Sequence, residues 1–136
     1  MSATGILDTN TVILLSRFAD PKVLPGVPTI TAITLAELSV GPLVATSASE
    51  SAARQAHLQQ AEADFDPLPF DAAAARAFGG VAADIRSSGR KTKARSYDAL
   101  IAAISISNDL PLYTVNPSDF AGIGRLELVA VPHPDA

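Results

Sequence analysis

The segment GILDTNTVILL, residues 5–15, decides the fold at the start of the chain. Its apolar residues Ile6 and Leu7 are typical of a short strand, but the run stops at Asp8 and becomes apolar again only at Val12. A carboxylate at such a break forms a turn, caps a helix, or is held as a charge at the edge of a sheet. The segment alone leaves both the helix cap and a functional role for Asp8 open.

The rest of the chain alternates between short apolar runs and longer helical patterns. The predicted strands cover residues 4–8, 28–33, 111–115 and 127–131, and the predicted helices cover 10–18, 34–41, 47–65, 72–87 and 97–108. This alternation predicts an α/β domain with a mostly parallel sheet. No linker, repeat or low-complexity tract interrupts the 136 residues, so we expect a single domain, 1–136.

Polar side chains mark where the first two helices are expected to start. Thr9 or Asn10 is expected to cap the helix over 10–18, and Thr34 is expected to cap the next one. The second helix should end at Gly41, because glycine followed by proline is typical of a helix end.

The composition narrows the classes of protein to which the chain can belong. The chain has no cysteine, which excludes disulfides and thiolate metal sites and favours a cytoplasmic location. No run approaches the ~20 apolar residues of a membrane span, and Asp8 interrupts the only candidate signal segment, so we expect no membrane association. The net charge of −4 argues against a protein that coats nucleic acid generally.

Basic side chains are concentrated in one part of this acidic chain. Five of the ten lysines and arginines lie in one short stretch: Arg86, Arg90, Lys91, Lys93 and Arg95. Such a run is either a solvated loop or a flank that grips a nucleic-acid backbone through its phosphates. We favour the second interpretation because the run leads directly to Asp98.

Four acidic residues follow predicted strands or open predicted helices. Asp8 ends the first strand, Glu37 and Asp98 each lie in the first turn of a helix, and Asp119 follows a later strand, three residues after Asn116. Ligands of an open α/β sheet bind outside the carboxyl ends of its strands. We therefore expect these acids to meet at one edge of the sheet.

Clustered carboxylates repel one another unless a cation neutralises them. One or two hard divalent cations with oxygen ligands, Mg²⁺ or Mn²⁺, would do so, and such ions support phosphodiester cleavage. A histidine zinc site is not expected, because His57 and His133 lack ligand spacing. We interpret His57, on a polar helix, as a surface or interface residue rather than a catalyst.

Each acid also has a purely structural interpretation. Asp8 could only cap a helix, Asp98 could only complement a helix dipole, and Asp119 could be an ordinary turn residue. Glu37 is harder to explain in this way, because its neighbours are apolar. The functional interpretation therefore depends on the joint placement of the four.

Three motifs resemble one family in their order and spacing. They are ILDTN at 6–10, TAITLAEL at 31–38 and YDALIAAISISNDLPLYTVNPSDF at 97–120. Together they resemble PIN-domain ribonucleases, and within these the VapC toxins of bacterial toxin–antitoxin pairs. The resemblance implies a three-layer α/β/α fold with a parallel sheet of about five strands. It also implies a Mg²⁺- or Mn²⁺-dependent endoribonuclease, a VapB-type antitoxin and a homodimer.

The resemblance also assigns roles to individual residues. The first three acids of the family, which hold the metal and are catalytic, match Asp8, Glu37 and Asp98. The fourth falls on either Asn116 or Asp119, and we choose Asp119 because some members of the family resemble this chain, with an asparagine first and an aspartate three places later. The expected supporting polar residues are Thr9, Asn10, Thr114 and Asn116, with Thr9 and Asn10 orienting Asp8. A basic antitoxin segment is expected to occupy the acidic groove.

Two other functions fit the same residues. A module with the same fold and without metal would bind its partners and cleave nothing. A phosphatase or phospho-acceptor domain would use an aspartate at a strand end as a nucleophile, but the second acid typical of such phosphatases is replaced here by Asn10.

Overall fold

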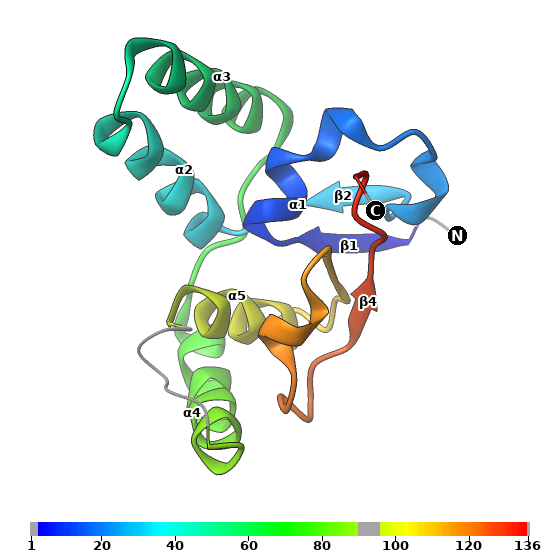
Figure 1. Cartoon of the computed structure of the whole chain (residues 1–136). Helices are drawn as coiled ribbons and strands as arrows, with labels where there is room; N and C mark the ends of the chain where they lie inside the picture. Colours follow the sequence, from blue (N-terminus) through cyan, green and yellow to red (C-terminus); the bar gives the residue numbers. More distant parts are fainter. Residues whose placement is uncertain (1–2, 90–95, 136) are drawn as a thin grey trace.

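The computed structural model describes residues 3–89 and 96–135. Its four strands are β1 (Thr4–Leu7), β2 (Val27–Thr29), β3 (Leu112–Thr114) and β4 (Leu128–Ala130). They form one sheet in the order β2-β1-β3-β4, and every pair is parallel (Figure 1). The predicted α/β class and parallel sheet are therefore confirmed.

The sheet has four strands among the described residues, and not about five. The extended piece nearest to a fifth strand pairs at one point only, where Leu68 bridges Thr31. The Leu68 amide donates to the Ile30 carbonyl (2.9 Å), and its carbonyl accepts from the Ala32 amide (2.8 Å). Leu68 stands between two prolines, which have no N–H to donate, so the pairing cannot extend.

The first helix is shorter than expected. It comprises α1 (Thr9–Ile13) followed by a separate 3₁₀ turn, η1 (Leu15–Arg17), in place of one helix over 10–18. Its cap is Asp8, whose side chain accepts from the Thr11 amide, and neither Thr9 nor Asn10. A second 3₁₀ turn, η2 (Pro21–Val23), leads to β2.

The second helix, α2 (Ala32–Val44), is longer than expected at both ends. Its cap is Thr31, whose hydroxyl accepts from the Thr34 amide (3.2 Å), so Glu37 lies in the second turn. The helix also continues through Pro42, and side chains of α3 (Ala48–Asp64) bond to carbonyls near its end. Arg54 donates to the Gly41 carbonyl, and Ser51 donates to the Pro42 carbonyl, each at 3.0 Å.

Helices cover both faces of the sheet, and two of them, α2 and α3, also project away from it. In Figure 1, α2 and α3 form a lobe at the upper left, while α4 (Ala72–Ser87) and α5 (Ser96–Ser107) pack together below the sheet. A 3₁₀ turn, η4 (Pro117–Phe120), follows β3. None of the helices in the described part of the chain is long and apolar enough to cross a membrane.

The core divides into two clusters, one on each face of β1. Ile6 packs with residues of α4 and α5, whereas its neighbour Leu7 packs with Ile30 and with residues of α1, α2 and α3. Successive side chains of a strand point to opposite faces, so a strand with both neighbours fully buried is covered on both sides. The expected three-layer α/β/α arrangement is therefore confirmed.

Candidate active site

Asp8 lies at the end of β1, and almost none of it is exposed. Its Oδ1 accepts from the amide (3.1 Å) and the hydroxyl of Thr11, and its Oδ2 accepts from the Thr114 hydroxyl (2.6 Å). Each hydroxyl in turn accepts from a backbone amide after β3: Thr11 from Val115 (3.1 Å) and Thr114 from Asn116 (2.9 Å). The two amides therefore direct both hydroxyl protons toward the Asp8 carboxylate.

The electrostatic environment of Asp8 is unfavourable for a charge. Burial raises the pKa of Asp8 above its ordinary value, and the negative charge of Asp119 raises it further. The hydrogen bonds from Thr11 and Thr114 act in the opposite direction, but they do not cancel the cost of burial. A positive charge near Asp8 would reverse this shift.

Glu37 lies across from Asp8 on α2 and is half-buried. Its Oε1 accepts from the Thr9 hydroxyl (2.7 Å), and the Thr34 hydroxyl lies 3.0 Å from that of Thr9. Since Thr9 has one hydroxyl proton and gives it to Glu37, Thr34 donates to Thr9. Burial raises the pKa of Glu37, the bond from Thr9 lowers it, and the charge of Asp8 raises it again.

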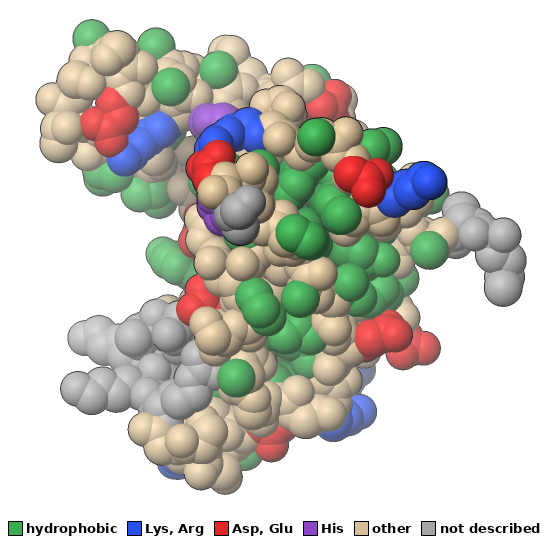
Figure 2. Space-filling view, turned by 45° about the vertical axis from the view of Figure 1, so that its right-hand side comes forward, with side chains coloured by type: hydrophobic (Ala, Val, Ile, Leu, Met, Phe, Trp, Pro, Cys, Tyr) green, Lys and Arg blue, Asp and Glu red, His purple; other side chains and the backbone are tan. Residues whose placement is uncertain are grey.

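The other two predicted acids begin helical segments at the same end of the sheet. Asp98 is in the first turn of α5 and Asp119 in that of η4, and both are half-buried. Figure 1 shows that α2 and α5 begin on the side where β1 and β2 end. Electrostatic coupling links Asp119 to Asp8 and Asp8 to Glu37. In Figure 2, acidic side chains line the hollow between the projecting lobe and the lower part of the molecule.

The supporting residues are arranged differently from the prediction. Thr114 does contact Asp8, and Asn116 supports Thr114 through its backbone amide. Thr9 instead holds Glu37, and the exposed Asn10 side chain makes no hydrogen bond to Asp8. Thr11 and Thr34, which the sequence reasoning missed, complete the two carboxylate networks. Their spacing, Thr11 three residues after Asp8 and Thr34 three before Glu37, was the only signal for them.

The predicted basic flank is largely outside the described residues. Arg86 is exposed near the end of α4, whereas Arg90, Lys91, Lys93 and Arg95 belong to the segment that the structure does not describe. Contact of these five side chains with a nucleic-acid backbone stays a prediction.

The donors at this site fit a hard divalent cation by their chemistry. Asp8, Glu37, Asp98 and Asp119 offer only carboxylate oxygens, the ligands that Mg²⁺ and Mn²⁺ prefer. No described Lys or Arg pairs with Asp8 or Glu37, whose raised pKa values a cation would lower. Within residues 3–89 and 96–135, however, no three acidic or histidine side chains form a group that could hold an ion. The described carboxylates are therefore of the right chemical type for the metal, but they do not form a complete set of ligands around one point.

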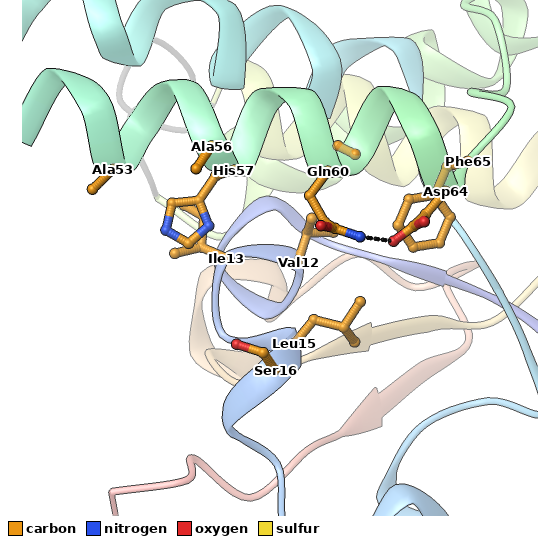
Figure 3. Close-up of a pocket in the computed structure, with 11 residues that line it drawn as sticks. Val12, Ile13, Leu15, Ser16, Ala53, Ala56, His57, Gln60, Asp64 and Phe65 are labelled. Carbon is orange, nitrogen blue, oxygen red and sulfur yellow. Dashed lines mark hydrogen bonds between the residues drawn. The ribbon is translucent and has the colours of Figure 1, made fainter.

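Two hollows adjoin this site along α1 and α3. The larger is an apolar groove of about 630 Å³ between α1, η1 and α3, lined by Val12, Leu15 and Phe65 among others (Figure 3). The smaller, of about 280 Å³, borders Thr9 and Glu37. Ile13 and His57 line both and so stand between them.

Comparison with known proteins gives one full-length relative. The chain is 37% identical over 134 residues to ribonuclease VapC5 of Mycobacterium tuberculosis, and the match covers 95% of this chain and 96% of the relative. No family model matches the chain.

Solved structures show the same architecture. A VapBC-5 toxin–antitoxin structure from M. tuberculosis matches with a TM-score of 0.76 and 34% identity, covering 95% of this chain and 99% of the other. VapBC2 from Rickettsia felis, bound to a promoter DNA fragment, matches in fold with a TM-score of 0.72 at 24% identity, covering 92% and 96%. With the identity to VapC5 over nearly the whole of both chains, these findings show that the chain belongs to the VapC family of PIN-domain ribonucleases.

Proposed function

We propose that this chain is a divalent-metal-dependent endoribonuclease that acts as the toxin of a type II toxin–antitoxin pair. The observation that carries the proposal is the pair Asp8 and Glu37, two carboxylates that burial and neighbouring negative charges make costly without a cation. Membership of the VapC family supports RNA as the substrate.

The chain's own residues would hold and orient the reacting groups. Asp8, Glu37, Asp98 and Asp119 would hold Mg²⁺ or Mn²⁺, which would neutralise charge on the scissile phosphate and make a water more acidic. The hydroxyls of Thr11 and Thr114 fix the Asp8 carboxylate, and that of Thr9 fixes Glu37. Glu37 or Asp119 would also accept a proton from the attacking water.

A VapB-type antitoxin is the proposed partner. The structural neighbours are VapBC toxin–antitoxin structures, which supports pairing with a protein of that type. The net charge of −4 and the acidic site suit a basic antitoxin segment. The homodimer and the cytoplasmic location expected from the sequence stay proposals.

Cleavage of RNA by an Asp8→Asn variant tests the site. Asparagine keeps an oxygen that can cap α1 but removes the charge, so the fold should persist while cleavage with Mn²⁺ falls at least a hundredfold. Rates on a structured RNA should be compared with those of Asp66→Asn, which neutralises an exposed acid elsewhere. Cleavage by Asp8→Asn at the wild-type rate would refute the assignment.

A silent binding module is the second candidate, favoured by the lack of a closed ligand set among the described residues. The two functions differ in metal binding. Titration calorimetry and thermal unfolding with Mn²⁺ should show binding heat and stabilisation in the wild type, both reduced in Asp8→Asn. Absence of both effects in the wild type would favour the silent module.

A further inference from the structure

The small hollow beside Glu37 borders the hydrogen-bond network of that carboxylate. Thr9, which donates to Glu37, forms part of its lining, and Glu37 itself forms another part. Its volume of about 280 Å³ lies at the lower limit of small-molecule sites, which span roughly 300–1,000 Å³. The space therefore suits one small, compact group beside the proposed reaction centre.

The walls of the hollow combine apolar surface with polar groups at the rim. Ile13 and Leu38 supply the apolar surface, and the exposed amide of Asn10 can both donate and accept hydrogen bonds. An unstacked nucleobase has the same division, with apolar faces and hydrogen-bonding edges, and proteins that read RNA commonly enclose such bases. The lining thus matches a base better than it matches a phosphate.

His57 is the aromatic group of this lining. It is half-buried, and Figure 3 shows its ring reaching from α3 toward Ile13 of α1. Among the described residues, no hydrogen bond involves the His57 imidazole, so the ring can both stack on a ligand and hydrogen-bond to it.

Arg54, the one arginine of this lining, is committed elsewhere. Its guanidinium donates to the Gly41 carbonyl (3.0 Å) and pairs with Glu50, which neutralises its charge. The Arg54 guanidinium already has these protein partners, so it is poorly suited to bind a phosphate.

We infer that this hollow binds the base of one nucleotide next to the scissile phosphate, with His57 and Ile13 as the residues that contact it. The inference rests on the proposed ribonuclease function and adds a specificity site to it. His57 is accordingly a substrate-contacting residue, beyond the surface role that the sequence suggested.

The test pairs a change in the protein with a change in the RNA. A short RNA with one cleavage site is prepared intact and with an abasic ribose on either side of the scissile phosphate. In the wild type, one abasic substitution should lower kcat/KM about tenfold, the size expected for one lost base contact. The kcat/KM of His57→Ala on the intact RNA should be about tenfold below that of the wild type, and that abasic substitution should not lower it further. His57→Gln, which keeps hydrogen bonding, should recover part of the loss.

The matched control is Gln60→Ala, one turn further along α3. Gln60 lines the apolar groove but not the small hollow, so this variant should respond to the abasic substitution as the wild type does. Thermal unfolding of each variant separates misfolding from loss of contact.

Binding provides a second readout that does not need cleavage. Fluorescence anisotropy with the Asp8→Asn protein should show about tenfold weaker binding of the abasic RNA, and no difference when His57→Ala is added. If the abasic substitution weakens RNA binding equally with and without the His57 side chain, the inference is wrong. The inference is also wrong if His57→Ala leaves RNA binding unchanged and weakens only an antitoxin complex. Failure of the wild type to cut any RNA with Mn²⁺ would instead refute the proposed function.

Discussion

The Asp8 carboxylate caps α1 and also accepts a hydrogen bond from β3. The sequence predicted its place at a strand end and left a capping role for Asp8 open, but the expected cap of the helix over 10–18 was Thr9 or Asn10. That assignment failed because Thr9 gives its hydroxyl to Glu37, 28 positions away. A residue's local preference for capping cannot reveal such a partner, since the contact exists only after α2 has packed against α1.

At the same scale, Glu37 should make the metal-free protein less stable as the pH rises. Its pKa is raised above the ordinary 4.5, so its contribution to stability is complete below the unfolded-state pKa and is lost as the pH rises through the folded-state pKa. Glu37→Gln keeps an acceptor for Thr9 but cannot ionise. The free energy of unfolding of this variant, relative to wild type, should therefore increase above about pH 4.5 and then level off.

Urea unfolding in EDTA between pH 4 and 8 measures this difference. Glu62→Gln, an exposed acid of α3, serves as the control and should show no such rise. A relative stability of Glu37→Gln that falls with pH would mean that the carboxylate is stabilised by its surroundings.

At the scale of elements, the structure follows the predicted order of strands and helices but differs at their ends. The end of α2 is the clearest case, because Gly41 and Pro42 are typical of a helix end and yet lie inside the helix. Arg54 and Ser51 of α3 satisfy the exposed carbonyls there. Helix ends set by side chains of another helix cannot be found from local sequence, whereas buried strands and capped helix starts largely can.

The caps of α2 and α3 should affect function differently. Thr31→Ala removes the cap of α2 and should cost about 1 kcal/mol of stability, and it should also lower cleavage severalfold because α2 carries Glu37. Ser47→Ala removes the exposed cap of α3 at a similar or smaller cost in stability and should leave cleavage unchanged. Chemical denaturation and RNA cleavage rates check the pair. Equal loss of cleavage in both would show that α2 does not position Glu37.

For the whole molecule, the two core clusters imply two independent packing regions. Ile6 belongs to the cluster on α4 and α5, and Ile30 belongs to the cluster on the other face. Both are fully buried. Successive side chains of the central strand β1 are both buried but on opposite faces, so the strand contributes to two cores. The sequence predicted a buried strand here, but the partners on each face depend on how distant helices pack.

Ile6→Val and Ile30→Val should each destabilise the protein by about 0.5–1.5 kcal/mol, through a lost methyl group and the cavity it leaves. Because the two residues share no cluster, their costs in the double variant should add to within about 0.5 kcal/mol. Chemical denaturation of the single and double variants gives the sum. The exposed Val44→Ala is the control and should change stability little. A larger coupling would mean that the sheet transmits packing changes between its faces.

The bridge between Thr31 and Leu68 joins the two ends of the segment that forms the lobe of α2 and α3. The chain leaves the sheet at one point and returns beside it, tied by two backbone hydrogen bonds. A turn added at the far tip, between Val44 and Ala48, would therefore lengthen the lobe without shifting the register of any strand. Glu37 and His57 line the same hollow and both lie midway along their helices, so such a change would extend the lobe without removing either side chain from that hollow.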